Sequence, residues 1–399
     1  MENLKLLRNA KLKSRQLELK KKIQQESTSS RLNSNLFDSN SNYLECLENN
    51  SSQEDFFSKL SDEIILKIFN FIPRKTLLKY AIVCKRWHQL MSDEFLWISF
   101  DLSYRINHAE TVMKLLNLGV KMLALGHSDI RKSTKKYVTQ NDENLRNLNA
   151  QFNKYLFNSL KIEFLDLTNA LIDTDSLNSL LKHCKSLLKL SLESLEINNE
   201  TFLSLSKNKR LETLNLTSCR GFTVEGVIIL LESFKNLVSL NMAWTDLDRE
   251  SVYIICKHLP SSIKKLSLAG CKTTLLDSDI QNLVISCPNI VDLDLSDAQS
   301  LTNLSIETIS NGFRNLEYVA FSRCYSIIPS SYFMLAKLRN LFAIDLFNIL
   351  KANSIQTLKN YIPTLRFVNR YPFCFIARPR IGNMRKSLWG YKISQNLSK

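Results

Sequence analysis

The sequence is poor in glycine and proline, with 8 and 7 of these residues among 399. Collagen-like and low-complexity chains are rich in one or both, so the composition excludes these classes. No apolar run approaches the roughly 18 residues that a membrane-spanning helix needs, and the longest is Val-Ile-Ile-Leu-Leu at 227–231. The basic N-terminus lacks the apolar segment of a secretory signal peptide. We therefore expect an intracellular protein without a membrane partner, long enough for two or three domains.

Residues and motifs typical of catalytic or metal sites are also scarce. Histidine occurs five times, and the sequence has no CxxC pair, Cys/His cluster, P-loop, GxSxG or HExxH motif. His183 and His258 occupy equivalent places in the repeat described below, which favours a structural role. Nine cysteines in a chain without a secretion signal do not indicate a disulfide framework. We expect no catalytic residue, no metal and no cofactor, and hence a protein that is not an enzyme.

The formal charge of +15 is concentrated in three segments. Residues 1–25 carry eight basic and two acidic side chains, residues 126–160 carry six and three, and residues 370–399 carry seven and none. These segments hold +16, so the rest of the chain has a net charge of −1. Nucleic acid is therefore an unfavoured partner for the body of the protein, because the excess charge belongs to its attachments.

The N-terminal arm, residues 1–55, divides into two parts. Its first 25 residues are predicted to be a nuclear-import or polyanion-binding patch, or simply a solvated arm. Residues 26–55 are rich in Ser and Asn and hold too few large apolar side chains to offset the entropy of ordering, so we expect disorder. On this basis, we expect the protein in the nucleus and the cytoplasm.

Residues 56–99 have the pattern of a small helical unit. The run Leu60-Ser61-Asp62-Glu63 predicts a helix start, with Ser61 as the cap and two acidic residues at the positive helix end. Apolar residues then recur at helical spacing until Pro73. A second helical run is predicted from Thr76 to Leu90, and a third turn from Ser92. Three short helices in so few residues make a small core and leave apolar side chains for a partner.

The string LSDEIILKIF…LLKYAIVCKRWHQLMSDEFLW resembles an F-box, with Ser61 in place of the usual proline. The resemblance implies binding to S-phase kinase-associated protein one, the adaptor of cullin–RING ubiquitin ligases. It also implies which residues contact the adaptor: Phe57, Leu60, Ile64, Ile68, Phe69, Lys79 and Trp87. The alternative is that Ile64, Ile68 and Trp87 only fill the small core.

From residue 162 onward the pattern apolar-x-x-apolar-x-apolar recurs eight times. Its central residue advances by 24 to 27 positions, through Leu165, Leu190, Leu214, Leu240, Leu266, Leu293, Val319 and Ile344. This is the period of leucine-rich repeats, in which a short strand and a returning helix stack into a solenoid. Weaker copies at Phe100/Leu102, Val120/Leu123/Leu125 and Leu365/Val368 extend the array, and residues 126–160 are predicted to be an inserted loop.

The predicted fold is therefore α/β: a three-helix F-box, then a leucine-rich-repeat horseshoe over residues 100–369, then a basic tail over 370–399. Helices are expected, for example, over residues 175–184 and 225–234. The tail breaks the repeat but carries large apolar residues among its seven basic ones. We therefore expect it to pack back on the concave face, along a row of small residues that runs from Thr168 to Ser322.

The cysteines are predicted to be buried small apolar residues rather than nucleophiles. Cys219, Cys271 and Cys324 stand three residues after the last strand leucine, as in the cysteine-containing class of leucine-rich repeats that commonly follows an F-box. Only Cys46 and Cys374 lie outside the repeat and motif positions. A thiol enzyme, as an alternative, would have to use one of these two.

A contact site is predicted on one rim of the horseshoe, in the row two residues after the last leucine of each repeat. Most repeats carry small residues there, whereas three carry residues typical of binding hot spots or charged contacts. With two basic residues just beyond this row, the predicted site consists of Arg220, Trp244, Lys272, Asp297 and Arg323. The alternative is a packed tryptophan among solvated charges.

The strings CYSIIP at 324–329 and IARPRIGN…LWGYK at 376–392 resemble a narrower group, the cell-cycle F-box/leucine-rich-repeat receptors. This resemblance implies that the tail covers the concave face and that a cyclin-dependent kinase regulatory subunit docks beside it. The two together would hold a phosphorylated cyclin-dependent kinase inhibitor, with Trp244, Lys272, Asp297 and Arg323 at the rim. Lys272 stands where the relatives have Arg, and residues 1–55 do not resemble their N-terminal arm.

The expected function is that of a substrate-recognition subunit of an SCF-type (adaptor–cullin–F-box) ubiquitin ligase. Such a receptor holds a phosphorylated cell-cycle regulator near a ubiquitin-charged partner for ubiquitination and proteasomal degradation, and it performs no bond chemistry itself. Two alternatives remain open besides a thiol enzyme: a receptor of this class for an unrelated substrate, and a leucine-rich-repeat scaffold that binds nucleic acid.

Overall fold

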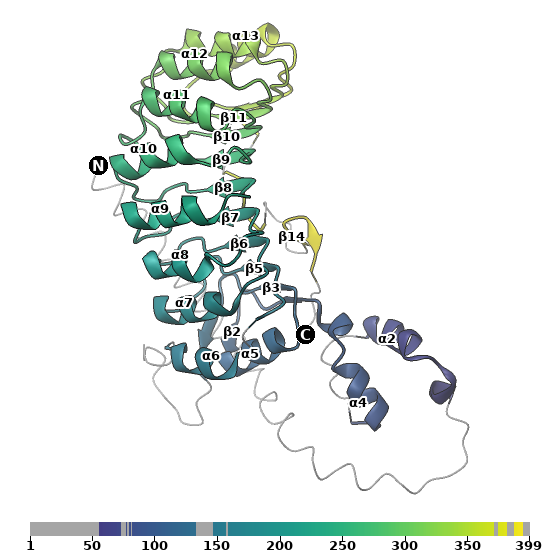
Figure 1. The fold of residues 1–399 in the computed structure, drawn as a ribbon. Coiled ribbons are helices and arrows are strands. Elements are labelled where there is room, and N and C mark those ends of the chain that lie inside the picture. The colour runs from purple at the N-terminus through teal and green to yellow at the C-terminus, as the bar shows by residue number, and fades with distance from the viewer. Residues whose placement is uncertain are drawn as a thin grey trace, which may run out of the picture.

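The computed structural model describes residues 56–72, 77, 80, 82–132, 147–156, 159–370, 374–380 and 387–393. A small helical unit leads into a long solenoid of stacked strands and helices (Figure 1). The predictions for the arm 1–55 with Cys46, for Pro73 and Lys79, and for the middle of the inserted loop lie outside the described residues. Among the described residues, no helix combines the length and the apolar character needed to cross a membrane.

The helical unit contains η2 (Phe56–Lys59), α2 (Asp62–Asn70), α4 (Lys85–Met91) and η3 (Glu94–Trp97). Ser61 occupies the cap position of α2, but its side chain makes no capping hydrogen bond. The carboxylate of Asp62 instead accepts a hydrogen bond from Arg86 Nε at 2.8 Å. The helical run predicted from 76 to 90 is confirmed at Leu77, at Tyr80 and from Lys85 onward, but it is not continuous. Residues 82–84 break it, and α4 begins at Lys85 with Cys84 as the cap, whose Sγ accepts from the Trp87 amide.

The solenoid is built on one sheet of eleven parallel strands in the order β1-β3-β5-β6-β7-β8-β9-β10-β11-β12-β13. The central apolar residues of neighbouring strands pair directly, as in Leu165↔Leu190↔Leu214, and they are fully buried. The predicted ladder of leucines is thereby confirmed. The strands are β1 (Ser99–Asp101), β3 (Met122–Ala124), β5 (Phe164–Asp166), β6 (Lys189–Ser191), β7 (Thr213–Asn215), β8 (Ser239–Asn241), β9 (Lys265–Ser267), β10 (Asp292–Asp294), β11 (Tyr318–Ala320), β12 (Ala343–Asp345) and β13 (Phe367–Val368).

Helices return the chain from one strand to the next and stack along the other side of the sheet (Figure 1). Several of these helices start at an Asp, Asn or Thr whose side chain caps the helix. For example, the carboxylate of Asp173 accepts a hydrogen bond from the Ser176 amide at 3.0 Å. The helices predicted at 175–184 and 225–234 are α7 and α9, each shifted by one residue. The set is α5 (Ala109–Asn117), α6 (Asn149–Tyr155), α7 (Thr174–His183), α8 (Asn199–Leu205), α9 (Val224–Ser233), α10 (Arg249–His258), α11 (Asp277–Ser286), α12 (Asn303–Gly312), η5 (Pro329–Lys337) and α13 (Ala352–Tyr361).

The segment 126–160 is more than an inserted loop, which corrects the prediction. Its strand β4 (Asp129–Arg131) pairs in parallel with β2 (Ile106–His108), and α6 packs beside α7. Phe152 of α6 is fully buried. The described parts of the segment therefore belong to a divergent repeat between β3 and β5, whose helix α6 covers the first regular helix, α7.

The helical unit and the solenoid share one hydrophobic core. The ring of Trp97 stacks on that of Phe100 with centroids 5.6 Å apart, and the amide of Lys121 donates to the Ile98 carbonyl. The Nζ of Lys161 also reaches the Glu94 carboxylate at 2.5 Å. These contacts fix the helical unit at the N-terminal end of the solenoid.

Residues 374–380 and 387–393, here called the tail strap, cross the concave face from the last repeats toward the first. The ring of Phe375 lies 5.0 Å from Tyr318 of β11, whereas Leu388 is buried among Met122, Ala124 and Phe164 of β3 and β5. The strap ends in a hairpin of β14 (Ser387–Leu388) and β15 (Tyr391–Lys392) (Figure 1). The prediction that the tail packs back on the concave face is confirmed.

Candidate functional site

The F-box presents an apolar surface on α2. Ile64 and Ile68 are 45% and 36% exposed, while Ile65 and Phe69 on the opposite side are buried in the core. Of the seven residues predicted to contact the adaptor, Ile64 and Ile68 therefore face solvent. Phe69, at 1% exposure, supports the helix from inside.

Trp87 lies at the centre of an aromatic cluster beneath this surface. Its ring lies 5.1 Å from Phe57, 4.9 Å from Phe69 and 6.2 Å from Tyr80, each time edge to face. It is half-buried, as are Phe57 and Leu60. Trp87 thus packs the small core and still has a face accessible to a partner.

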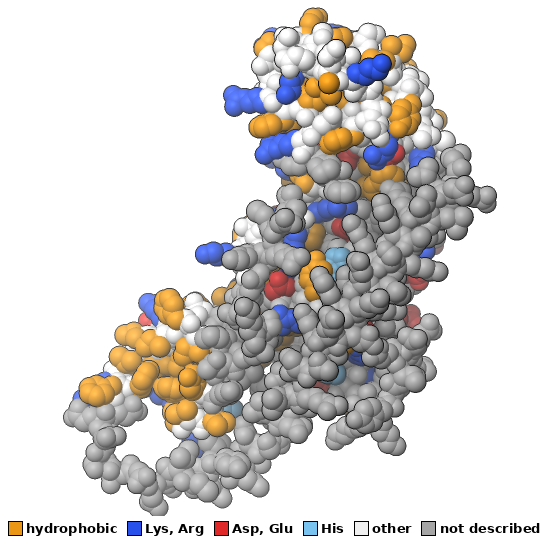
Figure 2. All heavy atoms as spheres, turned by 180° about the vertical axis from the view of Figure 1, so that it is seen from behind, with side chains coloured by type: hydrophobic (Ala, Val, Ile, Leu, Met, Phe, Trp, Pro, Cys, Tyr) orange, Lys and Arg blue, Asp and Glu red, His pale blue; other side chains and the backbone are white. Residues whose placement is uncertain are grey.

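Several exposed apolar residues next to α2 and α4 were missed by the motif comparison. Phe71 is 89% exposed and Phe56 74%, and Ile82 and Val83 are about half exposed. Figure 2 shows hydrophobic side chains gathered on the F-box. The sequence signal was present: all four are large apolar residues that the predicted helical faces leave unused. We call this apolar set, with Ile64 and Ile68, the adaptor surface.

An unpredicted arginine holds the adaptor surface together. Arg86 donates to the carbonyls of Leu60 at 2.6 Å and Phe57 at 3.0 Å, in addition to its bond with Asp62. It therefore fixes the start of α2 against α4. Arg86 stands between Lys85 and Trp87 of the F-box string, and no role was assigned to it from the sequence.

The rim row has one backbone property that the sequence analysis did not recognise. Every member of the row lies in the left-handed region, with φ of 60° at Trp244, 90° at Gly270 and 63° at Asp297 and Arg323. The chain turns there to leave the strand, and residues other than glycine rarely adopt this conformation. Gly270 is also required for space, because a Cβ at this position would lie 2.7 Å from the Trp244 ring.

The structure brings three of the five predicted rim residues together. Arg323 Nε donates to Asp297 Oδ1 at 2.7 Å, its Nη2 pairs with Oδ2, and the guanidinium lies 5.8 Å from the Trp244 ring. The hydrogen bond with Asp297 raises the pKa of Arg323. We call Trp244, Gly270, Asp297 and Arg323 the rim cluster.

The two remaining rim residues lie apart from the cluster's contacts. Arg220 and Lys272 are exposed in adjoining loops, and neither forms an ion pair with a described residue. The charge of Arg323 is already balanced by Asp297. The uncompensated positive charge of the rim therefore comes from Arg220 and Lys272.

A row of polar residues at the strand ends receives the tail strap and was not predicted. It consists of the residue between the last two apolar positions of a repeat, except in the repeat of β11, where Ala320 stands there. Asn241 Nδ2 donates to the Ile376 carbonyl of the strap at 2.8 Å, and Asp345 Oδ1 accepts from the amide of Arg370, just ahead of the strap, at 2.8 Å. The strap also contacts the row that runs from Thr168 to Ser322, because Arg378 pairs with Glu193 of that row.

Two arginines of the strap pair with carboxylates of the concave face, of which Asp166 is buried and Glu193 and Asp101 are partly buried. Arg378 lies 3.2 Å from Glu193, and Arg380 Nη2 lies 2.9 Å from Asp101 with its Nε 3.9 Å from Asp166. Burial raises the pKa of Asp166 to about 6, an effect that hydrogen bonds from Thr168 and the charge of Arg380 oppose. These ion pairs within the protein therefore neutralise part of the positive charge of the tail.

All the described cysteines are free thiols. Burial raises the pKa of Cys184, Cys219, Cys271 and Cys324 to about 12, so these thiols stay protonated. Burial likewise raises the pKa of Cys374 well above its usual range. Cys374 therefore lacks the thiolate character that a thiol enzyme needs.

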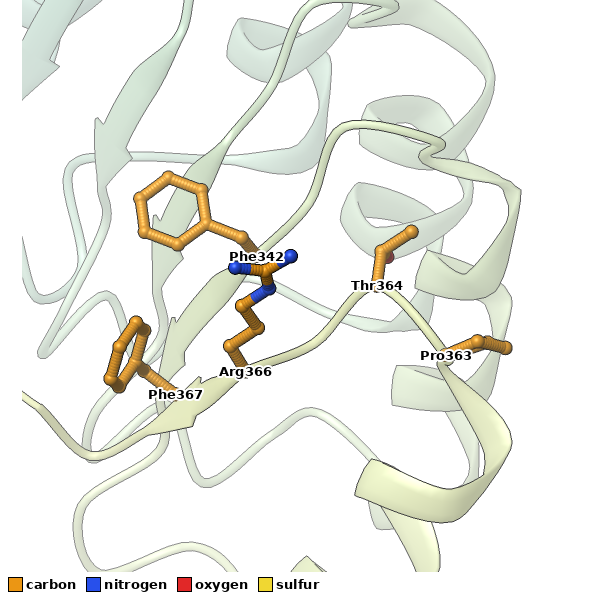
Figure 3. A pocket seen from close by; sticks show the side chains of 5 residues that line it. All are labelled: Phe342, Pro363, Thr364, Arg366 and Phe367. Carbon is orange, nitrogen blue, oxygen red and sulfur yellow. The ribbon is translucent and has the colours of Figure 1, made fainter.

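A shallow pocket of about 600 Å³ lies at the C-terminal end of the solenoid. Figure 3 shows Phe342, just before β12, and Phe367 of β13 on one side of the pocket, the Arg366 side chain beside them, and Thr364 and Pro363 on the preceding loop. The lining contains neither a carboxylate nor a thiol nor a histidine. It offers no acid–base pair for catalysis.

Two family profiles match the chain. One, described as F-box-like, covers residues 58–103, and the other, described as the SKP2 LRR domain, covers residues 110–396. The chain belongs to the SKP2 LRR domain family. The profile of this domain spans both the rim cluster and the whole tail strap. The solenoid and the strap are thus features of one SKP2 LRR domain.

Relatives with known sequences are distant. Protein PAC2 of Saccharomyces cerevisiae is 24% identical over 210 residues, 49% of this chain and 39% of PAC2. A putative F-box/LRR-repeat protein of Arabidopsis thaliana is 24% identical over 263 residues, 52% of this chain and 60% of that protein. Cell division control protein 4 of Candida albicans is 38% identical over 52 residues, 13% of this chain and 8% of its own. The chain thus matches less than two thirds of each relative's length.

Solved structures with a similar trace include a chain of the Rad7 and Elc1 complex from yeast. Its TM-score is 0.42 at 16% identity, covering 79% of this chain and 94% of that chain. The leucine-rich repeat-containing protein LegL7 from Legionella pneumophila has a TM-score of 0.41 at 14% identity, covering 67% and 89%.

Proposed function

We propose that this protein is the substrate-recognition subunit of an SCF-type ubiquitin ligase. The observation that carries the proposal is the adaptor surface: six large apolar side chains stand exposed on a unit whose sequence matches an F-box. Isolated exposed apolar residues are ordinary, but a set gathered on a unit of this size indicates a protein interface. The partner is the adaptor S-phase kinase-associated protein one and, through it, the cullin–RING core.

The solenoid supplies the second half of the proposed activity. A rigid horseshoe that shares its core with the F-box would hold a bound protein at a fixed distance from the ubiquitin-charged partner. Catalysis then rests on proximity, because a tethered lysine meets the thioester at high effective concentration. F-box/leucine-rich-repeat families are receptors, and the proposal assigns no bond chemistry to this chain.

We further propose a target of the kind implied by the resemblance to S-phase kinase-associated protein two. In this proposal a cyclin-dependent kinase regulatory subunit binds the rim cluster, and both hold a phosphorylated cell-cycle regulator. Trp244 offers a large ring on the rim, and Lys272 an exposed cation in an adjoining loop, residue types suited to an acidic or phosphorylated partner. The place of action is the nucleus and the cytoplasm.

Co-purification with the adaptor tests the receptor function. The double variant Ile64→Asp with Ile68→Asp places two charges on the adaptor surface without touching the core, and we expect it to abolish co-purification. Ile285→Asp is the matched control, since Ile285 is 80% exposed on α11, far from the F-box. If the wild-type chain does not bind the adaptor, or if the double variant binds as well as the control, the proposed function is wrong.

A further inference from the structure

The two lateral edges of the solenoid carry opposite charge. The loops that lead from helix to strand, residues 182–188, 206–212, 232–238 and 257–264, hold eight Lys or Arg and two Glu. In the same four repeats the loops from strand to helix, residues 168–176, 193–201, 217–226 and 243–251, hold nine acidic residues and two Arg. We call these the basic edge and the acidic edge. The near-neutral body is therefore strongly polarised.

The cations of the basic edge are exposed and have no acidic partner. They are Lys182, Lys185, Lys207, Lys209, Arg210, Lys235, Lys257 and Lys264. None of them forms an ion pair with a described residue, whereas arginines elsewhere do: Arg249 pairs with Asp279 and Arg380 with Asp101. Their charge is therefore available to a partner.

Helix stability explains the acidic edge but not the basic one. On the acidic edge Asp173 and Asp248 cap α7 and α10 through hydrogen bonds to backbone amides. On the basic edge only Lys182 and Lys257 lie in a last helical turn, where a cation favours the helix dipole. The other six cations follow the helices or precede the strands and have no such role.

The loops that carry these cations are tied to one another. The Lys209 carbonyl accepts from Asn236 Nδ2 at 2.8 Å, and the Lys235 carbonyl accepts from Ser262 Oγ at 3.0 Å. Since α7 to α10 stack in order (Figure 1), the cations form a row with a fixed backbone spacing. Neighbouring repeats lie about 5–10 Å apart in such an array, so the row fits an extended chain that carries several negative charges.

We propose that the basic edge docks an extended acidic segment of a protein, with Asp, Glu or phosphorylated Ser/Thr side chains crossing four repeats. The site is separate from the adaptor surface and the rim cluster. A single nucleic-acid strand fits less well, because the loops of the basic edge expose no Phe, Tyr or Trp for base stacking, and the exposed Tyr253 of α10 is already contacted by Lys257. A duplex also fits less well, since short loops offer no helix or ribbon for a groove.

Fluorescence anisotropy with a labelled decaglutamate peptide tests this proposal on the full chain. The double variant Lys209→Glu with Lys235→Glu reverses two central charges. We expect binding at about 0.05 M salt to weaken at least about tenfold. The control Lys67→Glu with Lys351→Glu changes the net charge equally from two exposed sites off the basic edge, and we expect less than about a twofold change.

Three results would overturn the proposal: no binding of the peptide by the wild-type chain, equal weakening in both double variants, or tighter binding of a duplex DNA of about 20 base pairs that depends on the basic edge. The double variant Lys209→Gln with Lys235→Gln removes the two charges without reversing them, so it controls for misfolding caused by the Glu substitutions. We expect its loss of peptide affinity to be intermediate. None of these measurements involves the adaptor, so their outcome is independent of the receptor proposal.

Discussion

Replacing Arg380 tests whether charge pairing holds the tail strap in place. Arg380→Met keeps much of the side-chain length but leaves the carboxylates of Asp101 and Asp166, 12% and 2% exposed, without their cation. Removing one partner of a buried ion pair costs about 3–5 kcal/mol. Because Arg380 keeps 15% exposure and lies 3.9 Å from Asp166, we expect a loss of about 2–3 kcal/mol in the free energy of unfolding.

The titration of Asp166 gives this loss a pH signature. Its pKa is about 6 in the folded protein, above the ordinary 3.8. The contribution of Asp166 to stability is therefore complete below pH 3.8 and is lost as the pH rises through about 6. The positive charge of Arg380 lowers the pKa of Asp166, so this pKa rises further when Arg380 is replaced. The cost of Arg380→Met should accordingly be largest above pH 6 and smaller near pH 5.

Urea unfolding followed by circular dichroism at about pH 7.5 and pH 5 measures both effects. Lys392→Met, in the exposed strand of the same hairpin, is the matched control and should be nearly neutral. A loss below about 0.5 kcal/mol for Arg380→Met, or an equal loss at both pH values, would refute the reasoning.

Two further predictions concern the rim cluster. Gly270→Ala should lower the free energy of unfolding by at least about 1 kcal/mol, because φ is 90° at this position and the new Cβ meets the Trp244 ring. Differential scanning calorimetry measures this loss, and an unchanged melting temperature would contradict the geometry. Trp244→Ala should weaken binding of the kinase regulatory subunit by about 2 kcal/mol or more in titration calorimetry, whereas unchanged affinity would mean that the ring only packs.

The repetitive part of the fold was predictable because every repeat carries the same sequence pattern. One leucine ladder fixes strand position and register, and a polar cap some eight residues later fixes the helix start, so α7 and α9 were placed to within one residue. Because the pattern occurs eight times, an ambiguous assignment in one repeat is resolved by the others. The same argument located the rim residues Trp244 and Arg323, since they interrupt a row of small ones.

Features that depend on contacts between distant segments were not predictable. The helical period around Ile64 and Phe69 does not say which side faces the core, because both sides of α2 are apolar. The break before Cys84 interrupts a run whose composition favours a helix. The match of Arg380 to Asp101 joins residues 279 positions apart, and nothing in either local sequence indicates the other.

The tail strap changes how the array should unfold. In a solenoid each repeat touches only its neighbours, so end repeats can fray while the middle stays folded. Here one segment contacts Tyr318 near the end of the array and Asp101 at its start, so the terminal repeats cannot open independently. The strap converts a chain of nearest-neighbour units into one cooperative body, and a protein cut before residue 374 would lose this coupling.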